Sequence, residues 1–224
     1  GIPYELIDAE VSGFVFEKIE DEDDYKLVSY TGTDAVVEIP AKGPDGNAVT
    51  VIGASAFENN TTVTSIVMPN TIDNLEPGAF AGCTNLKSIR ISNKLSGMED
   101  RVFAGCTSLT NIDLPGEIVW IGEEAFKGCT SLTSIVIPSE CNGIGSVFAN
   151  CTALRDVWFG ELCDFIDRYA FEGCSSELTL HAPSGSYAEE YASQNGFNFV
   201  STDAQEVYTY TLLDNGTYEV AGYT

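Results

Sequence analysis

The chain has 224 residues, of which 44% are hydrophobic, and its 34 acidic residues against 10 lysines and arginines give a formal charge of −24. This charge argues against nucleic acid or an anionic lipid surface as a partner, because both are bound by clustered basic side chains. No apolar run approaches the length of a membrane span, so we expect no membrane insertion, and the start GIPYELIDAE lacks the basic and apolar regions of a signal peptide.

Residues 1–48 predict a β-rich N-terminal cap with a lead-in half-repeat. Alternating apolar residues on both sides of the acidic run Glu20–Asp24 favour strands or a hairpin, and Pro44-Asp45-Gly46 is typical of a turn. The acidic run is the best candidate for a divalent cation, but it lacks the spaced D-x-D-x-D-G pattern of a calcium loop. We therefore expect a solvated turn there and no metal site.

Residues 49–183 contain six copies of one pattern, which is anchored on a phenylalanine every 22 or 23 residues. The anchors are Phe57, Phe80, Phe103, Phe126, Phe148 and Phe171. A small residue precedes each anchor, and a cysteine follows three positions later in five copies, at Cys83, Cys106, Cys129, Cys151 and Cys174. An aliphatic residue comes next, except at Glu177 in the last copy, and an alternating apolar pair then ends the unit.

This pattern predicts a solenoid. The alternating pair, such as Ile135 and Ile137, places two side chains on one face of a short strand. The segment GEEAFKGC favours one or two helical or 3-10 turns. A unit of this length cannot bury its own apolar face, whereas stacked units with parallel strands about 4.8 Å apart can. We expect the five repeated cysteines to be reduced and buried, with Cys141 and Cys163 the best candidates for a bridge.

The motif L-x-x-I-x-I resembles leucine-rich repeats, and IGEEAFKGCTSLTSIVIP at Ile121–Pro138 closely resembles the repeat of BspA-like bacterial surface proteins. The resemblance covers about Val49–Pro183. It implies an α/β fold: a right-handed leucine-rich-repeat solenoid with a parallel sheet of short strands on its concave side and short helical or 3-10 turns on its convex side. Only Asn70 and Asn93 follow strands, so we expect the Cys and Phe stacks to fill the core without an asparagine ladder.

Residues 184–200 predict a short capping helix, with Ser184 or Ser186 as N-cap, Tyr187 and Tyr191 on one face, and Gly196 as its end. Residues 201–224 begin as a linker. The segment Tyr208–Thr224 then resembles the alternating aromatic pattern near residue 14, which makes it a candidate start of a second module. An ordinary edge hairpin is the alternative.

The outward-facing strand positions are the candidate binding surface. Most are small, and the residues that stand out are Arg90, Asp113, Val136, Asp156, Trp158 and His181. We expect no catalytic residue, because His181 is the only histidine and no G-x-S-x-G motif accompanies it. We expect no cofactor or metal, because the cysteines lack the close spacing of zinc ligands.

The resemblance implies a non-catalytic extracellular adhesion module of a bacterial surface or secreted protein. Its partner would be a host or microbial surface protein or a glycan, bound on the concave face. Two alternatives remain open. A carbohydrate-active β-solenoid enzyme would need acidic and basic residues stacked on neighbouring strands, for which only Arg90 and Asp113 are candidates. A structural spacer would need no binding surface.

Overall fold

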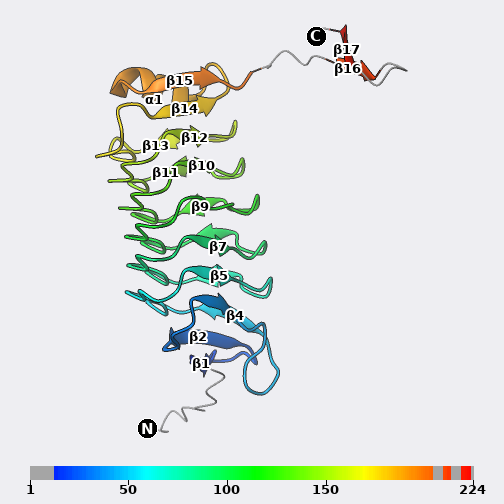
Figure 1. The fold of residues 1–224 in the computed structure, drawn as a ribbon, viewed down its shortest axis with the longest axis vertical. Coiled ribbons are helices and arrows are strands. Elements are labelled where there is room, and N and C mark those ends of the chain that lie inside the picture. The colour runs from blue at the N-terminus through cyan, green and yellow to red at the C-terminus, as the bar shows by residue number, and fades with distance from the viewer. Residues whose placement is uncertain (1–12, 204–208, 213–217, 223–224) are drawn as a thin grey trace.

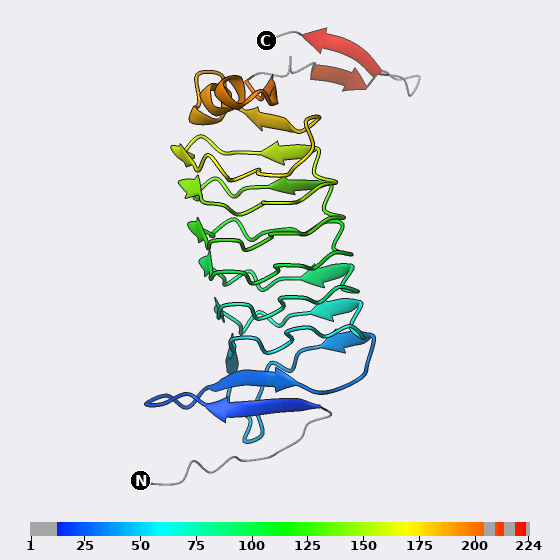
Figure 2. The ribbon, with the colours of Figure 1, turned by 90° about the vertical axis from the view of Figure 1, so that its left-hand side faces the viewer.

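Residues 13–203, 209–212 and 218–222 are described by the computed structural model. The chain winds into coils that stack in a column with little curvature, with a hairpin at the N-terminal end and the only α-helix of the described residues at the other end of the column (Figure 1). Figure 2 shows the same stack turned by 90°, with equivalent segments of successive coils lying above one another. The predicted fold class, a solenoid of parallel strands, is confirmed.

Each coil carries two strand positions. The outward side chains of the first set form what we call the main face, and its strands are β3 (Val36–Glu38), β5 (Ser65–Val67), β7 (Ser88–Arg90), β10 (Ser134–Val136), β12 (Asp156–Trp158), β14 (Thr179–Ala182) and β15 (Asn198–Ser201). The outward side chains of the second set form the second face, and its strands are β4 (Val49–Ile52), β6 (Asn74–Leu75), β8 (Gly97–Met98), β9 (Trp120–Ile121), β11 (Gly143–Ile144) and β13 (Phe165–Ile166). The second set was not predicted.

The sheet of the main face is parallel and in register with the repeat, so Ile66 pairs with Ile89 and Ile135 with Val157. The expectation of a strand in every copy is wrong for residues 111–113. No ladder of backbone hydrogen bonds joins them to a neighbouring coil within the described chain, and the sheet divides there into β3-β5-β7 and β10-β12-β14-β15.

A column of aromatic rings runs through the core. The six anchor phenylalanines stack on one another with ring centroids 5.1 to 5.7 Å apart. Both ends of the column are closed by residues outside the repeats. Tyr30 stacks on Phe57 at 5.1 Å, and Tyr191 and Phe197 meet Phe171 edge-on. The caps therefore continue the packing of the repeats and do not merely cover it.

The segments around the phenylalanines are turns, so the prediction of helical or 3-10 structure is wrong. In the second copy the amides of Ala79, Ala81 and Cys83 bond to carbonyls three residues earlier. The intervening amides of Gly78, Phe80 and Gly82 instead bond to the next coil. A helix would use every amide internally. Successive amides can bond in turn within the coil and to the next coil because Gly78 and Gly82 adopt φ of 67° and 71°, the left-handed region that glycine tolerates.

The repeated cysteines link neighbouring coils. Each thiol lies 3.0 to 3.2 Å from the carbonyl oxygen of the phenylalanine one coil earlier, to which it donates, beginning with Cys83 and Phe57. All seven cysteines are free, including Cys141 and Cys163. Cys174 corrects the expectation of complete burial, because the last coil leaves it partly exposed. Burial raises the pKa of Cys129 to about 12 and that of Cys174 to about 11.

The N-terminal end is closed by strands β1 (Phe14–Lys18) and β2 (Tyr25–Tyr30), which pair antiparallel around the acidic turn. Strand β2 then pairs in parallel with β4, so the hairpin continues the sheet of the second face. The lead-in turn at Pro44-Asp45-Gly46 has Gly46 at φ 91°. The cap thus blocks the open end of the column with paired backbone as well as with apolar side chains.

At the C-terminal end, helix α1 (Tyr187–Asn195) begins at Ser186, whose side chain accepts from the amide of Glu189, and ends at Gly196 with φ 76°. Tyr191 is buried but Tyr187 is exposed, so the two do not share the core-facing side as predicted. Leu178 is buried where the repeat pattern expected an aliphatic residue at Glu177, so the aliphatic residue stands one position later in the last copy, within a segment of the same length. Strand β15 then adds to the edge of β14.

Strands β16 (Thr209–Leu212) and β17 (Tyr218–Gly222) form a second antiparallel hairpin. Its register shift lies between Thr209 and Tyr210, as that of the N-terminal hairpin lies between Val15 and Phe16. The sequence similarity of the two segments therefore extends to their pairing. Such pairing is expected both for the start of a second module and for an ordinary edge hairpin. The rest of the segment lies outside the described residues. The second module therefore stays a prediction.

Replacing Phe126 with alanine should lower the free energy of unfolding by about 3 to 5 kcal/mol, as for other buried phenylalanines. Its ring is fully buried between those of Phe103 and Phe148. Urea denaturation measures the change. Phe165→Ala is the matched control. Phe165 lies two coils further along and is 51% exposed, so its replacement should lower the free energy of unfolding much less. Equal losses in the two variants would contradict the role of the aromatic column.

Thiol labelling should count seven free cysteines after denaturation without reductant, since none is bridged. In the native protein at neutral pH we expect slow labelling, because burial shields the thiols from the reagent and raises the pKa of most of them, and the thiolate is the reactive form. Cys174 should react first, as the one thiol with partial exposure. Mass spectrometry after alkylation measures both quantities, and a mass deficit of two labels would reveal a bridge.

The free energy of unfolding should fall as the pH rises above about 8.5, the ordinary pKa of a thiol. The folded pKa of Cys129, near 12, exceeds that value, so its contribution is complete below pH 8.5 and is lost as the pH rises towards 12. The slope contributed by one such thiol is at most about 1.4 kcal/mol per pH unit. Urea titrations from pH 8 to 11 should show a shallower slope in Cys129→Ala, whereas an unchanged slope would contradict the assignment.

Candidate functional site

The outward side chains of the main face form two columns along the stack. The first position of each strand is mostly small or polar: Val36, Ser65, Ser88, Asn111, Ser134, Asp156, Thr179 and Asn198. The third position is more varied: Glu38, Val67, Arg90, Asp113, Val136, Trp158, His181 and Val200. Large side chains therefore gather in the third position towards the C-terminal end.

Trp158 and His181 are paired residues on the neighbouring strands β12 and β14. Their rings stack with centroids 4.5 Å apart and an angle of 13° between the planes. The Nε2 atom of His181 lies 2.8 Å from Oδ1 of Asp156, the outward residue two positions before Trp158. Parallel pairing of the two strands thus brings three of the predicted site residues into one cluster.

The cluster holds the histidine firmly. The His181 side chain is only 16% exposed, because the indole covers one face of its ring and Asp156 binds its edge. Trp158 is consequently half-buried and not the fully exposed side chain that its position in the strand suggested. The partly exposed indole and its apolar neighbours, rather than the imidazole, are what the surface offers to a ligand.

Exposed valines extend the cluster on both sides. Val136 pairs with Trp158 and is 60% exposed, and Val200 pairs with His181 and is 48% exposed. We call Val136, Trp158, His181 and Val200 the apolar strip. Val200 was not predicted as a surface residue of the sheet, because the sequence pattern assigned this segment to the end of a capping helix. The alternation in Asn198-Phe199-Val200 was the signal that could have identified another strand.

Two shallow depressions mark the main face. One, of about 370 Å³, is lined by Leu114, Val136, Pro138, Trp158, Phe159 and Gly160, among others. The other, of about 230 Å³, is lined by Ser65, Val67, Ser88, Arg90, Asn111 and Asp113, among others. The predicted residues Arg90 and Asp113 are exposed on adjacent coils and form no ion pair within the described chain. They therefore belong to a separate depression and not to the apolar strip.

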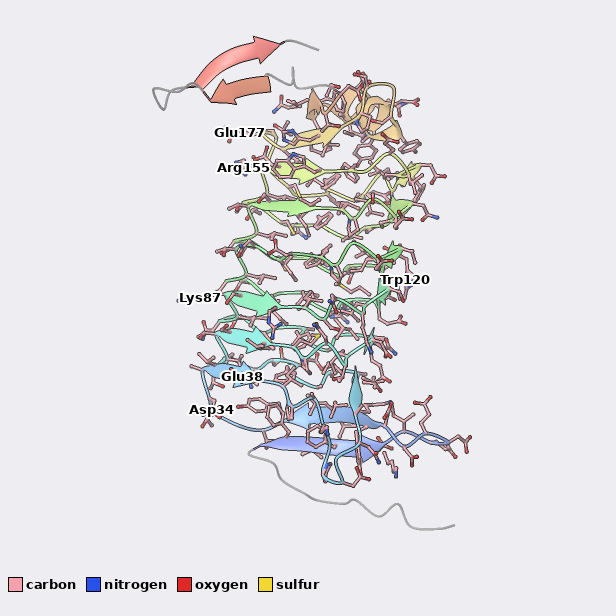
Figure 3. All side chains as sticks on the ribbon, turned by 90° about the vertical axis from the view of Figure 1, so that its right-hand side faces the viewer. Asp34, Glu38, Lys87, Trp120, Arg155 and Glu177 are labelled. Atoms are coloured by element: carbon pink, nitrogen blue, oxygen red, sulfur yellow. The ribbon has the colours of Figure 1, made fainter. Side chains whose placement is uncertain are left out.

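Charged residues border the main face. Figure 3 shows Asp34, Lys87, Arg155 and Glu177 along one edge, with Glu38 of strand β3 beside them, whereas Trp120 lies on the opposite side of the column. Arg155 and Glu177 form an exposed ion pair of 3.4 Å between neighbouring coils. Such pairs contribute little stability in water but give the rim of a contact surface a polar character.

The main face offers a contact surface and one hydrogen-bonded pair of titratable side chains, His181 and Asp156. In the part of the chain that the structure describes, no group of three or more His, Cys, Asp or Glu residues could hold a metal ion. The repeated thiols point into the core and bond to backbone carbonyls. His181 has a carboxylate partner, as a general base would, but both depressions are shallow and open. Of the described helices, none is long and apolar enough to span a membrane.

Two aromatic residues on the second face were not predicted as surface residues. Trp120 on β9 is 42% exposed and Phe165 on β13 is 51% exposed. Both immediately precede the inward-facing isoleucine of their copy, Ile121 or Ile166. This position was not recognised as outward-facing because no strand was predicted there, although alternation next to a repeated isoleucine was a usable signal.

Comparison with protein families gives one match. A model described as a BspA type leucine rich repeat region, with six copies, matches residues 50–177, which is more than half of the chain. The six copies agree with the six phenylalanine anchors of the sequence. No curated protein matches the chain.

Several solved structures are similar. A leucine-rich cell surface protein from Faecalibacterium prausnitzii A2-165 is 35% identical, with a TM-score of 0.59 over 65% of this chain. The chain spans 38% of the length of that protein. Two further structures share the fold. A T. pallidum leucine-rich-repeat protein is 20% identical, with a TM-score of 0.64, and the match covers 85% of this chain and 96% of that protein. The pneumococcal vaccine antigen PcpA is 16% identical, with a TM-score of 0.68, and the match covers 86% of this chain and 48% of that protein.

Proposed function

The chain belongs to the BspA-type leucine-rich-repeat family, and from this membership and the geometry of the main face we propose that it is a non-catalytic binding module. In this proposal the module is part of a bacterial surface or secreted protein and works outside the cell. Its partner is a protein or a glycan of a host or microbial surface. Support for this location comes from the F. prausnitzii relative, which is described as a cell surface protein.

The apolar strip is the observation that carries the proposal. It combines an aromatic ring with flanking valines that are more than 45% exposed, while most other outward positions of the main face are small or polar. Binding energy at interfaces concentrates on aromatic anchors surrounded by a polar rim. Asp156 and the ion pair of Arg155 with Glu177 supply polar groups around the strip. A stack of coils presents this surface on a rigid support.

The two alternatives make different demands on the same residues. An enzyme would need the pair of His181 and Asp156 to face a bound substrate, yet the indole of Trp158 covers one face of the imidazole. A spacer would need no apolar strip, whereas Val136 and Val200 extend the apolar surface around Trp158. We therefore favour binding over both.

Replacing Trp158 with alanine should weaken binding by at least about 1 kcal/mol, roughly fivefold, while the fold is retained. A pull-down against matrix proteins and a glycan array identify the partner, and calorimetry then measures the affinity of the variant. Val67→Ala is the matched control, because Val67 occupies the same outward position on β5.

Circular dichroism should be unchanged in both variants, since each side chain lies on the surface of the sheet. Unaltered affinity in folded Trp158→Ala would place the site elsewhere. Equal losses in Trp158→Ala and Val67→Ala would show that the partner reads the whole main face and not the apolar strip.

A further inference from the structure

The outward positions of the second face alternate between glycine and an aromatic residue over four successive strands. Gly97 on β8 pairs with Trp120 on β9, and Gly143 on β11 pairs with Phe165 on β13. Strand β11 lies beside β9, so the four positions form a single row along the stack. The row therefore reads Gly97, Trp120, Gly143, Phe165.

The glycines allow the rings to lie flat. A methyl group at Gly97 would overlap the indole of Trp120. One at Gly143 would lie 2.9 Å from the backbone oxygen of Phe165, 3.0 Å from its Cβ and 3.3 Å from Cδ1 of its ring. The Trp120 ring thus lies over the glycine backbone of the preceding coil, and the Phe165 ring begins beside that of Gly143. Trp120 is 42% exposed and Phe165 is 51% exposed, so a large part of each side chain is open to solvent.

The two open rings are two coils apart, which corresponds to about 10 Å at the usual strand spacing. An extended, β-1,4-linked chain of pyranose rings returns the same ring face at every second residue, with a closely similar repeat. Pyranose rings pack the C–H groups of one face against aromatic rings. The solenoid thus holds two platforms at the spacing that alternate sugars of such a chain require.

The side chains near the two rings and the net charge of the protein indicate which class of polysaccharide would bind. Exposed Asn142 and Asp164 immediately precede Gly143 and Phe165, and their amide and carboxylate groups can accept hydrogen bonds from sugar hydroxyls. The charge of −24 disfavours sulfated or uronic-acid polymers. A protein partner is the weaker fit, because a ring that lies flat on the sheet cannot enter a pocket of the partner as an aromatic anchor does.

We propose that Trp120 and Phe165 form a binding site for a neutral β-1,4-linked polysaccharide that runs along the second face, parallel to the axis of the stack. This site is distinct from the main face and would act beside it. A polysaccharide long enough to contact both rings binds more tightly, because its contact with the second ring is then an intramolecular step. A disaccharide reaches only one platform and gains nothing from the second.

The test uses calorimetry and tryptophan fluorescence with cellohexaose, mannohexaose and chitohexaose, and with maltohexaose as the α-linked control. We expect at least one of the β-linked hexasaccharides to bind, its disaccharide to bind at least tenfold more weakly, and maltohexaose to bind no better than the disaccharide. Trp120→Ala and Phe165→Ala should each lower the hexasaccharide affinity by tenfold or more, with unchanged circular dichroism.

Two further variants distinguish this site from the main face and from a purely structural role of the rings. Gly97→Ala should tilt the Trp120 ring off the sheet and weaken hexasaccharide binding without unfolding the protein, because the obstructing atoms belong to a side chain. Val67→Ala, which changes an outward residue of the main face outside the apolar strip, should leave hexasaccharide binding unchanged. The proposal is overturned if no β-linked hexasaccharide binds, if Trp120→Ala binds as tightly as the wild type, or if Trp120→Ala instead abolishes capture of a protein in the pull-down.

Discussion

Stacking of one coil on the next is the constraint on which the structure depends. A coil of 22 or 23 residues has an apolar side that it cannot cover alone, and the phenylalanine column shows how the neighbours cover it, ring on ring. The column has two ends where this covering would fail. Tyr30 from the N-terminal hairpin and Tyr191 from helix α1 fill those ends with rings of the same kind. The caps are therefore part of the core, and their loss would expose apolar surface equivalent to that of a repeat.

The same constraint divides the sequence into residues that hold the stack and residues that are free to vary. The phenylalanines, the repeated cysteines and the inward aliphatic residues are needed for the core, since they pack against their equivalents in adjacent coils. Function must therefore reside in the outward positions. On the main face these bring Trp158 to His181, and on the second face they bring Trp120 to Gly97. Because pairing is in register, any two residues at equivalent positions of neighbouring copies become neighbours in space.

This regularity explains what could be predicted from the sequence. The spacing of the anchors predicted the fold, the phenylalanine stack and the adjacency of Trp158 and His181, because all three follow from periodicity. Features that depend on a local deviation from the repeat could not be predicted from its spacing. The alternating amide bonds around Gly78 depend on two left-handed residues, and the missing strand at 111–113 depends on the backbone of one coil. The bond between His181 and Asp156 required a rotamer that no spacing specifies. Trp120 and Phe165 were missed because their strands, β9 and β13, are only two residues long.

Some of the acidic side chains also hold neighbouring coils together. Glu76 accepts from the amide of Ala54 at 2.8 Å, Asp100 from that of Glu123 at 2.8 Å, and Glu123 from that of Ser146 at 3.0 Å. Each of these bonds joins neighbouring coils where a strand of the second face has just ended and the ladder offers no carbonyl. A carboxylate supplies the missing acceptor, and bonds of this kind are stronger than those between neutral groups. Gly145 leaves room for the Glu123 side chain, since a methyl group there would overlap it. Acids beside the strands of the second face are therefore partly structural, whereas Asp164 and others outside these bonds remain available to a ligand.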